Sequence, residues 1–348
     1  MKKINLLIIT SLSVFLYNCG NTENLFSIAT KDLKQVYKPN ESINLSVENA
    51  ENASIDSVVY YSNNEKLGTA TNNKTLNFKL EKLQFGVQDI KAVVFYEGKN
   101  AECLTSFEIV SNITPKLYET KDYTILNTFK HDTTAYTQGL EFYKGILLEG
   151  TGQNGESTLR KTDYKTGKVS KSVPLSPDYF GEGITVFNGK IYQLTWKNKI
   201  GFIYNAETLV QEKTFNYFAD IEGWGLTHND KHLIMSDGTN KIYFLNPETQ
   251  KMERSINVYS DTNAIAELNE LEWIEGKIWA NIYQKNAVVI INPENGAVEA
   301  VINFSDLDAK IENKGKDVLN GIAYNPATKT VFITGKDWDK MFEIKLKN

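Results

Sequence analysis

The chain has 348 residues and a mass of 39.4 kDa, which is more than one ordinary domain needs and predicts two domains. Hydrophobic residues make up 41% of it, and 18 Tyr, 17 Phe and 5 Trp make it rich in aromatic side chains, so the composition excludes a disordered protein. The formal net charge of -5, without any basic stripe, argues against a nucleic-acid-binding groove. Only three His and two Cys are present, which nearly excludes a histidine-rich zinc site.

The first 19 residues have the features of a targeting segment. A short basic start precedes an apolar run from Ile4 to Tyr17 that is too short to span a bilayer as a stable helix. The run ends at Cys19, as in a bacterial lipoprotein signal, where the cysteine becomes the lipid-modified first residue. Residues 1–19 are therefore interpreted as a lipoprotein signal peptide, and a plain secretory signal or a weak anchor is the alternative. The lipoprotein interpretation predicts a protein anchored to a membrane of the bacterial cell envelope, facing the periplasm or the surface.

Residues 24–115 predict a small immunoglobulin-like β-sandwich. Apolar residues alternate in its strand-like runs, as expected where one face of a strand is buried. The region has neither an antibody-type Cys and Trp signature nor a polar cluster that suggests a site, so we expect a spacer or docking module. If Cys19 is lipidated, Cys103 has no partner for an intramolecular disulfide and is expected to be a buried, small apolar residue. The predicted strands are 42–47, 57–62, 75–80, 89–96 and 104–110.

The rest of the sequence repeats itself five times. Each repeat opens with a polar or aromatic residue, then glycine in four of the five, then an apolar residue, and leads through a turn into a second strand. The starts recur every 42 to 51 residues, and a second hairpin follows in the first four. Four strands at this period are typical of a β-propeller. The starts are Gln138-Gly139-Leu140, Glu182-Gly183-Ile184, Trp224-Gly225-Leu226, Asn269-Glu270-Leu271 and Asn320-Gly321-Ile322.

The fifth repeat has no outer strand of its own. The segment 123–129, which precedes the first repeat, has the apolar pattern of the other outer strands. We expect it to complete the last sheet and close the ring, which removes an open sheet edge. The prediction is an all-β fold, with a five-bladed β-propeller over residues 118–348 preceded by the small immunoglobulin-like β-sandwich over residues 24–115.

The first residue of each start is expected to face the central channel. Glu182 is the one carboxylate at this position, and it lies between two glycines and behind Phe180. In a partly dry aromatic pocket a carboxyl group can have a raised pKa and act as a general acid and base. The alternative is a glutamate that only bonds the backbone across the channel. The second strands supply another ring of side chains at their ends, Trp196, Asp237, Tyr283 and Lys336. Catalysis is favoured because Trp196, Trp224, Asn269 and Lys336 are expected near Glu182.

Several short motifs also follow one another along the repeats. They are Tyr136-Thr137-Gln138-Gly139-Leu140, Glu149-Gly150-Thr151-Gly152, Phe180-Gly181-Glu182-Gly183, Gln193-Leu194-Thr195-Trp196, Glu222-Gly223-Trp224-Gly225-Leu226, Leu268-Asn269-Glu270-Leu271-Glu272, Asp317-Val318-Leu319-Asn320-Gly321-Ile322 and Thr334-Gly335-Lys336. Together they resemble the plant-type (papaya-type) glutaminyl-peptide cyclotransferases and their bacterial relatives. The resemblance covers essentially all of 118–348 and none of the predicted sandwich. It implies a five-bladed propeller enzyme that converts the N-terminal glutamine of peptides or proteins into pyroglutamate, releases ammonia and needs no catalytic zinc.

The same resemblance implies the roles of the site residues. Glu182 stands where the family has its acid/base, with Asn269 and Lys336 as its polar catalytic partners. A structural calcium lies on the propeller axis of the plant enzyme, but this sequence shows no dedicated ligand motif, so the metal stays open and no cofactor is expected for catalysis. The substrate-binding residues implied are Gln138, Tyr136, Phe180, Trp196, Trp224 and Tyr283, the last at a place where the plant enzyme carries Trp.

Two other functions fit a propeller, because the fold alone does not choose between activities. One is a non-enzymatic envelope propeller that binds peptides or protein partners. The other is a calcium-dependent, lactonase-like propeller, which would need several axial acids rather than one. His228 and His232 are spaced like metal ligands, but residues 229–231 predict a turn between them, so both are expected to be exposed loop residues.

Overall fold

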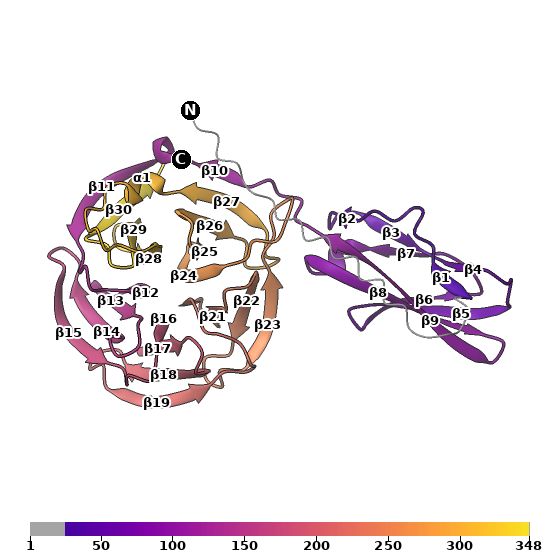
Figure 1. Ribbon diagram of the computed structural model, residues 1–348, viewed down its shortest axis with the longest axis horizontal. Helices are drawn as coiled ribbons and strands as arrows, with labels where there is room; N and C mark the ends of the chain where they lie inside the picture. Colours follow the sequence, from indigo (N-terminus) through magenta and orange to yellow (C-terminus); the bar gives the residue numbers. More distant parts are fainter. Residues whose placement is uncertain (1–24, 348) are drawn as a thin grey trace. The chain divides into compact units, whose positions relative to one another are not determined.

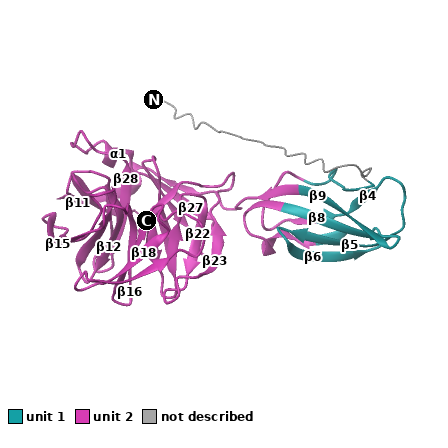
Figure 2. Ribbon diagram, turned by 60° about the horizontal axis from the view of Figure 1, so that its bottom comes forward, with its two compact units in different colours: residues 1–33, 44–77, 89–105 teal, residues 34–43, 78–88, 106–348 magenta. Residues whose placement is uncertain are grey.

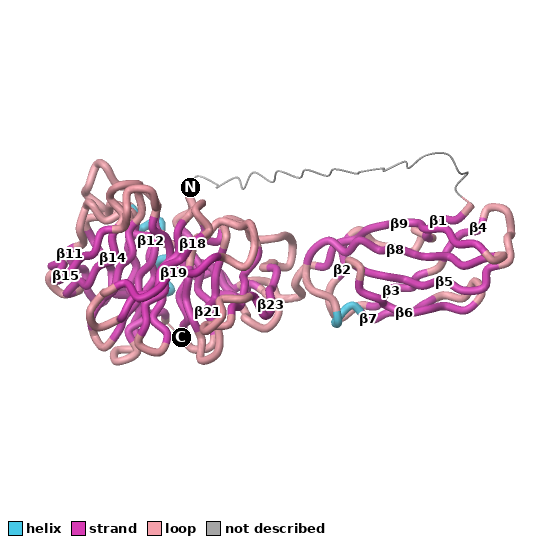
Figure 3. The backbone as a smooth tube through the Cα atoms, turned by 90° about the horizontal axis from the view of Figure 1, so that it is seen from below, coloured by secondary structure: helices cyan, strands magenta, loops and turns pink. Residues whose placement is uncertain are grey.

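The protein is described by a computed structural model that covers residues 25–347. Strands joined by loops make up most of the regular structure of these residues (Figure 3), with one four-residue helix, α1 (Ser305–Asp308), and two 3-10 segments at Leu80–Lys82 and Thr120–Asp122. No helix within this range is long and apolar enough to cross a membrane. The all-β prediction is confirmed. The predicted signal peptide and Cys19 lie outside the described residues.

The N-terminal strands form one five-stranded sheet, in the order β2-β9-β8-β5-β6, and two paired sheets, β1-β4 and β3-β7. Each of the five predicted segments contains a strand. Strands β1, β2 and β6 were not predicted. The first two have only three and two residues, and the sequence of β6, EKLGTAT, is mostly exposed and has no apolar alternation. The bounds are β1 Phe26–Ile28, β2 Val36–Tyr37, β3 Ser42–Leu45, β4 Val47–Asn49, β5 Ile55–Ser62, β6 Glu65–Thr71, β7 Leu76–Lys79, β8 Gly86–Tyr96 and β9 Lys99–Ile109.

Cys103 on β9 is half-buried, so the prediction of a fully buried cysteine is wrong. Alternate residues of this strand face outward over most of its length, and Cys103 sits next to the exposed Glu102 and Leu104. Burial nevertheless raises the pKa of the thiol to about 11, which makes it a poor nucleophile. Within the described residues it forms no disulfide.

The contacts divide the chain into two compact units (Figure 2). One contains residues 44–77, 89–105 and the described residues up to Leu33, and the other contains residues 34–43, 78–88 and the described residues from 106 onward. Within the residues that the structure describes, the second unit holds four sheets of four strands and one of five; in the last sheet along the chain the outer strand, β11 (Tyr123–Lys130), precedes the other three in the chain. The five-stranded sheet, the fourth along the chain, includes a short strand, β10 (Lys116–Tyr118), that adds in parallel to its outer strand.

The first three sheets run from the inside outward in chain order. They contain β12 (Thr137–Tyr143), β13 (Ile146–Thr151), β14 (Thr158–Asp163), β15 (Lys168–Pro174), then β16 (Gly181–Phe187), β17 (Lys190–Thr195), β18 (Ile200–Asn205), β19 (Gln211–Asn216), then β20 (Leu226–His228), β21 (Leu233–Ser236), β22 (Lys241–Leu245) and β23 (Met252–Asn257).

The fourth and fifth sheets complete the set. They contain β24 (Leu268–Ile274), β25 (Lys277–Ile282), β26 (Ala287–Ile291), β27 (Val298–Asn303), then β28 (Leu319–Asn325), β29 (Thr330–Gly335), β30 (Lys340–Leu346) and β11 (Tyr123–Lys130). Strand β11 pairs antiparallel with β30, so the prediction that segment 123–129 completes the last sheet is confirmed.

The innermost strands close a ring (Figure 1). Each contacts the next in the series β12, β16, β20, β24 and β28, and β28 contacts β12 again. The repeated glycines explain this approach, because a Cβ on Gly139 would lie 2.4 Å from the backbone nitrogen of Ile184, and one on Gly183 would lie 2.4 Å from that of Leu226. The glycine repeat is therefore a packing requirement between neighbouring sheets.

Candidate active site

A cavity of about 180 Å³ opens among the innermost strands and the turns that follow the second strands. Four of the five repeat starts place their first residue on an innermost strand, and Trp224 lies just before β20. The structure brings together every residue that the sequence analysis assigned to catalysis or substrate binding. The lining residues are Tyr136, Gln138, Phe180, Glu182, Trp196, Trp224, Asn269, Tyr283 and Lys336.

Two residues at the repeated positions, one at the end of a second strand and one at a repeat start, do not line the cavity. Asp237 turns away, since its carboxylate accepts hydrogen bonds from Thr239 and from the Tyr243 hydroxyl at 2.9 Å. Asn320 lies below the lining residues and donates from Nδ2 to Oε1 of Gln138 at 3.1 Å and to the carbonyl of Thr137 at 2.9 Å. Its role is to hold Gln138.

Glu182 is only 4% exposed. Its Oε1 accepts a hydrogen bond from Nε2 of Gln138 at 3.2 Å. Burial raises the pKa of the carboxyl well above its ordinary value, the positive charge of Lys336 opposes that rise, and the negative charge of Glu222 adds to it. Glu182 is therefore a buried carboxyl that holds a proton far more readily than a surface glutamate does.

Lys336 is 3% exposed, and its Nζ lies 4.7 Å from the ring centre of Tyr136 and 5.2 Å from that of Tyr283. Burial lowers the pKa of the ammonium group, while nearby acids, Glu182 first, raise it in part. The backbone of Lys336 is fixed by bonds to Val318 and Asp317 across the turn. A cation is thus held between two aromatic rings and faces the carboxyl group of Glu182.

Asn269 supplies an unsatisfied acceptor. Its Oδ1 is buried and has no hydrogen-bond partner among the described residues. Its backbone carbonyl accepts a bond from the Ser236 hydroxyl at 2.7 Å, which fixes the start of β24. A buried, unpartnered amide oxygen is costly to a fold, and the residue that carries it lines the cavity.

The aromatic side chains form continuous walls. The ring of Phe180 packs edge-on against Tyr136 at 6.1 Å and against Trp196 at 5.6 Å between ring centres. On the other side, Trp224 meets Tyr283 edge-on at 5.5 Å. These contacts hold the aromatic sides of the cavity in place.

The sequence analysis missed the role of Glu222. One of its oxygens, Oε2, accepts hydrogen bonds from Nε1 of Trp196 at 2.7 Å and from Nε1 of Trp224 at 3.0 Å. The signal was present only as an acid within the motif at 222–226, and the partner Trp196 comes from a different sheet. Spacing along the chain therefore could not reveal this contact.

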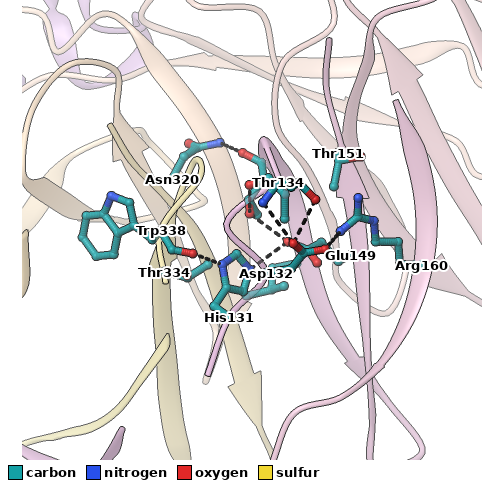
Figure 4. A network of polar contacts seen from close by, with 12 residues as sticks. His131, Asp132, Thr134, Glu149, Thr151, Arg160, Asn320, Thr334 and Trp338 are labelled. Carbon is teal, nitrogen blue, oxygen red and sulfur yellow. Dashed lines mark hydrogen bonds and ion pairs between the residues drawn. The ribbon is translucent and has the colours of Figure 1, made fainter. Parts of the chain in front are cut away.

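A buried ion pair lies behind the turn that carries Lys336 (Figure 4). Nδ1 of His131 donates to the carbonyl of Trp338 at 2.9 Å, and Nε2 contacts Oε1 of Glu149 at 3.0 Å. Burial alone would lower the pKa of His131, but the Glu149 charge and these contacts raise it overall. Thr137 also donates to Glu149 at 2.8 Å. The pair therefore joins the Lys336 turn to β12 and β13.

Three more carboxylates, Glu141, Glu270 and Glu272, are buried on the innermost strands. Glu270 replaces the repeated glycine of the fourth unit, and its two oxygens accept from the backbone nitrogens of Leu140 at 3.2 Å and Ile322 at 2.9 Å. Burial raises the pKa of all three, to about 8 for Glu141. They fix the backbone of the ring and do not line the cavity.

The two candidate metal-binding histidines have other partners. His228 lies at the end of β20, half-buried, with Nδ1 2.8 Å from the hydroxyl of Thr185, so the prediction that it is an exposed loop residue is wrong. The predicted turn at 229–231 is confirmed, and His232 follows it outside any strand, but it too is half-buried rather than exposed, with Nε2 3.0 Å from Glu253. Among residues 25–347 no group of three or more His, Cys, Asp or Glu side chains is arranged to hold a metal ion.

Comparison with known proteins agrees with this geometry. The family model described as Glutamine cyclotransferase matches residues 100–346, and so begins before the predicted boundary at 118. A protein of Arabidopsis thaliana named Glutaminyl-peptide cyclotransferase is 38% identical over 228 residues, which cover 64% of this chain and 71% of that protein. The crystal structure of Myxococcus xanthus glutaminyl cyclase is 32% identical with a TM-score of 0.61 and covers 67% of this chain and 98% of its own. The chain belongs to the glutamine cyclotransferase family.

Proposed function

We propose that this chain is a glutaminyl-peptide cyclotransferase, which closes the N-terminal glutamine of peptides or proteins to pyroglutamate and releases ammonia. The observation that carries the proposal is the meeting of three buried polar groups in one aromatic cavity. They are the carboxyl group of Glu182, the ammonium group of Lys336 and the side-chain amide of Asn269. A non-enzymatic peptide-binding propeller is not favoured by the family membership or by this set of groups.

The cavity fits one amino-acid residue rather than a peptide. Its volume of about 180 Å³ lies below the roughly 300–1,000 Å³ of pockets for drug-sized ligands. The N-terminal glutamine would enter it, and the rest of the peptide would extend out of the mouth. This restricts recognition to the first residue and its free amine.

The reaction is intramolecular, because the attacking amine and the amide that it attacks belong to the same residue. The α-amine nitrogen forms a bond to the side-chain amide carbon, and the bond from that carbon to the amide nitrogen then breaks. The enzyme's first task is to hold the folded rotamer that brings these two atoms together. We assign this task to the walls made by Phe180, Trp196, Trp224 and Tyr283 and to Tyr136.

The second task is proton transfer, which we assign to Glu182. Ionised Glu182 takes a proton from the attacking amine and, once protonated, gives it to the departing nitrogen, which leaves as ammonia. The burial that raises the pKa of Glu182 suits both halves of this cycle, because acid/base catalysts work best with a pKa near the working pH. Gln138 holds the carboxylate in place through its Nε2.

The third task is to stabilise the oxyanion of the tetrahedral intermediate. Lys336 is the charged donor on the cavity wall, and we assign the side-chain amide N–H group of Asn269, which also lines the cavity, as a second donor. Fixed donors of this kind act strongly in a site that excludes water. All the steps use side chains of this chain, and we propose that no metal takes part in them.

We also propose an architecture for the two parts of the chain and a location for the protein in the cell. The closed ring of five sheets supports a five-bladed β-propeller, and the N-terminal strands support an immunoglobulin-like sandwich that acts as a spacer. The lipoprotein signal in the sequence supports a protein anchored through Cys19 to a membrane of the cell envelope. Among the described residues, Glu270 and Glu272 of the ring already accept hydrogen bonds from backbone nitrogens, so they are not free carboxylate ligands for a structural calcium like that of the plant-type enzymes.

The proposed function is tested by ammonia release from a dipeptide that begins with glutamine. The purified protein should turn this dipeptide over, also in excess chelator, and should leave a dipeptide that begins with asparagine unchanged. Loss of turnover in chelator would show that a metal is needed. No turnover by a folded protein under any of these conditions would contradict the assigned activity.

A further inference from the structure

Glu222 joins two walls of the cavity that come from different sheets. Trp196 follows β17 of the second sheet, and Trp224 precedes β20 of the third. The only group that bonds both indole nitrogens among the described residues is Oε2 of Glu222, at 2.7 and 3.0 Å. Hydrogen bonds to an ionised acceptor are about twice as strong as neutral ones.

We propose that Glu222 is a positioning residue for the cyclisation, which fixes Trp196 and Trp224 as one rigid wall around the folded glutamine side chain. This inference rests on the proposed function. Trp196 packs against Phe180 and Lys197, and Trp224 packs against Tyr283 and Gly238, and the bonds to Glu222 fix the direction of both indole N–H groups. Rigid walls matter here, because a misplacement of about 1 Å can cost roughly 10²-fold in rate.

The fold of the loop does not depend on the Glu222 side chain. The backbone nitrogen of Gly223 donates to the carbonyl of Trp196 at 3.0 Å, and that of Trp224 donates to the carbonyl of Ser236 at 3.1 Å. Gly225 donates to the Ser236 hydroxyl at 2.8 Å. These bonds hold the loop between β19 and β20, so substitutions of Glu222 should leave it in place and change only the two indoles.

The charge of Glu222 has a second effect, on Glu182. The groups that face Glu182 are Gln138, Lys336, Glu222 and Tyr217. Lys336 lowers the pKa of the Glu182 carboxyl and Glu222 raises it. Removing the Glu222 charge should therefore lower the pKa of Glu182 and move the acidic limb of the kcat profile to lower pH.

Two variants separate position from charge. Glu222→Gln keeps one oxygen acceptor and removes the charge, whereas Glu222→Leu removes both. The matched control is Asp220→Asn, because Asp220 lies in the same loop, is 84% exposed and pairs with Lys199 rather than with a cavity residue. The measurements are kcat and KM for a glutamine-initiated dipeptide between pH 5 and 9, and the near-ultraviolet circular dichroism of the tryptophans.

Glu222→Gln should keep most of the near-ultraviolet signal and shift the acidic limb of kcat to lower pH. Glu222→Leu should change that signal and lower kcat by about 10²-fold, with a smaller change in KM, while Asp220→Asn matches the wild type. Unchanged kcat, pH profile and tryptophan signal in both variants would overturn the inference. If Glu222→Leu does not fold, the kcat, pH profile and tryptophan signal of Glu222→Gln alone decide the outcome. Inactive wild-type protein would instead count against the proposed function. The tryptophan signals of the variants would still test whether Glu222 fixes Trp196 and Trp224.

Discussion

Gln138 and Glu182 join the innermost strands of two neighbouring sheets through one hydrogen bond, from Nε2 to Oε1 over 3.2 Å. The amide oxygen of Gln138, Oε1, accepts a hydrogen bond from Nδ2 of Asn320 on a third sheet. The proposed acid/base is thus oriented by an amide whose own direction is fixed. A donor to a carboxylate favours its ionised form, so Gln138 offsets part of the effect of burial on Glu182.

Lys336 should set the acidic limb of the activity profile. Its charge lowers the pKa of Glu182, so Lys336→Met should raise that pKa and move the acidic limb of kcat to higher pH. This shift is opposite in direction to that expected for Glu222→Gln. The control is Lys314→Met, because Lys314 is exposed. A limb that stays in place in Lys336→Met would show that Lys336 does not act on the catalytic proton.

Asn269→Ala should lower kcat by about 10²- to 10³-fold, the cost of removing one fixed polar group that stabilises a transition state. KM should change less, because the expected contact forms fully only as the ring closes. Steady-state kinetics with a glutamine-initiated dipeptide provide the measurement. A rise in KM with kcat unchanged would make Asn269 a ground-state binding residue.

Breaking the His131–Glu149 pair should destabilise the ring. Glu149→Gln leaves a buried imidazolium without its partner, which typically costs about 3–5 kcal/mol. The pKa of His131 is raised above 6.5 and that of Glu149 is lowered below 4.5. The ion pair therefore contributes its full share of the folding stability between pH 4.5 and 6.5. Its contribution is lost as the pH rises through the folded pKa of His131 or falls through that of Glu149.

Urea unfolding at about pH 5.5, followed by tryptophan fluorescence, measures this effect. All five Trp of the chain lie after residue 195, so the signal reports the ring of sheets and not the N-terminal strands. Glu312→Gln is the control, because Glu312 is 80% exposed in its pair with Lys340 and should cost about 1 kcal/mol or less. Equal losses in the two variants would show that the buried pair has no special role.

Glu141 should make the ring less stable as the pH rises. Burial raises its pKa from 4.5 to about 8, so the folded state holds a proton that the unfolded state has already released. Stability is therefore lost between about pH 4.5 and 8. Glu141→Gln keeps an acceptor for Thr185 and Val186 and should flatten this slope. If the stability of the variant falls with pH as steeply as that of the wild type, the proton is released by another group, and Glu270 and Glu272 are the next candidates.

The sequence predicted the site well because of the repeats. Positions that recur in every sheet face the same side, so the starts at Gln138, Glu182 and Asn269 and the ends at Trp196 and Lys336 had to converge once the ring closed. The cross-sheet bond from Gln138 to Glu182 is a consequence of the same geometry. Strands with regular apolar alternation were also found, whereas the polar strand β6 was not.

The contacts between side chains outside the repeated positions could not be predicted. Glu222 bonds two indoles from different sheets, and His131 reaches a glutamate 18 residues away and a carbonyl 207 residues away. Glu270 looked like a simple departure from the glycine repeat, yet its oxygens bind the backbones of two other strands. Such pairings depend on the three-dimensional register of separate sheets, which a pattern along the chain does not contain.

The most direct test of the mechanism is a comparison of Glu182→Gln with the wild type on a glutamine-initiated peptide, with binding and turnover measured separately. The variant should unfold at the wild-type temperature, bind the peptide within about threefold of the wild-type affinity, and lose about 10²- to 10⁴-fold in kcat, the usual range for an acid/base residue. Turnover within tenfold of the wild type in this folded, peptide-binding variant would contradict the assignment of Glu182 as the group that moves the proton.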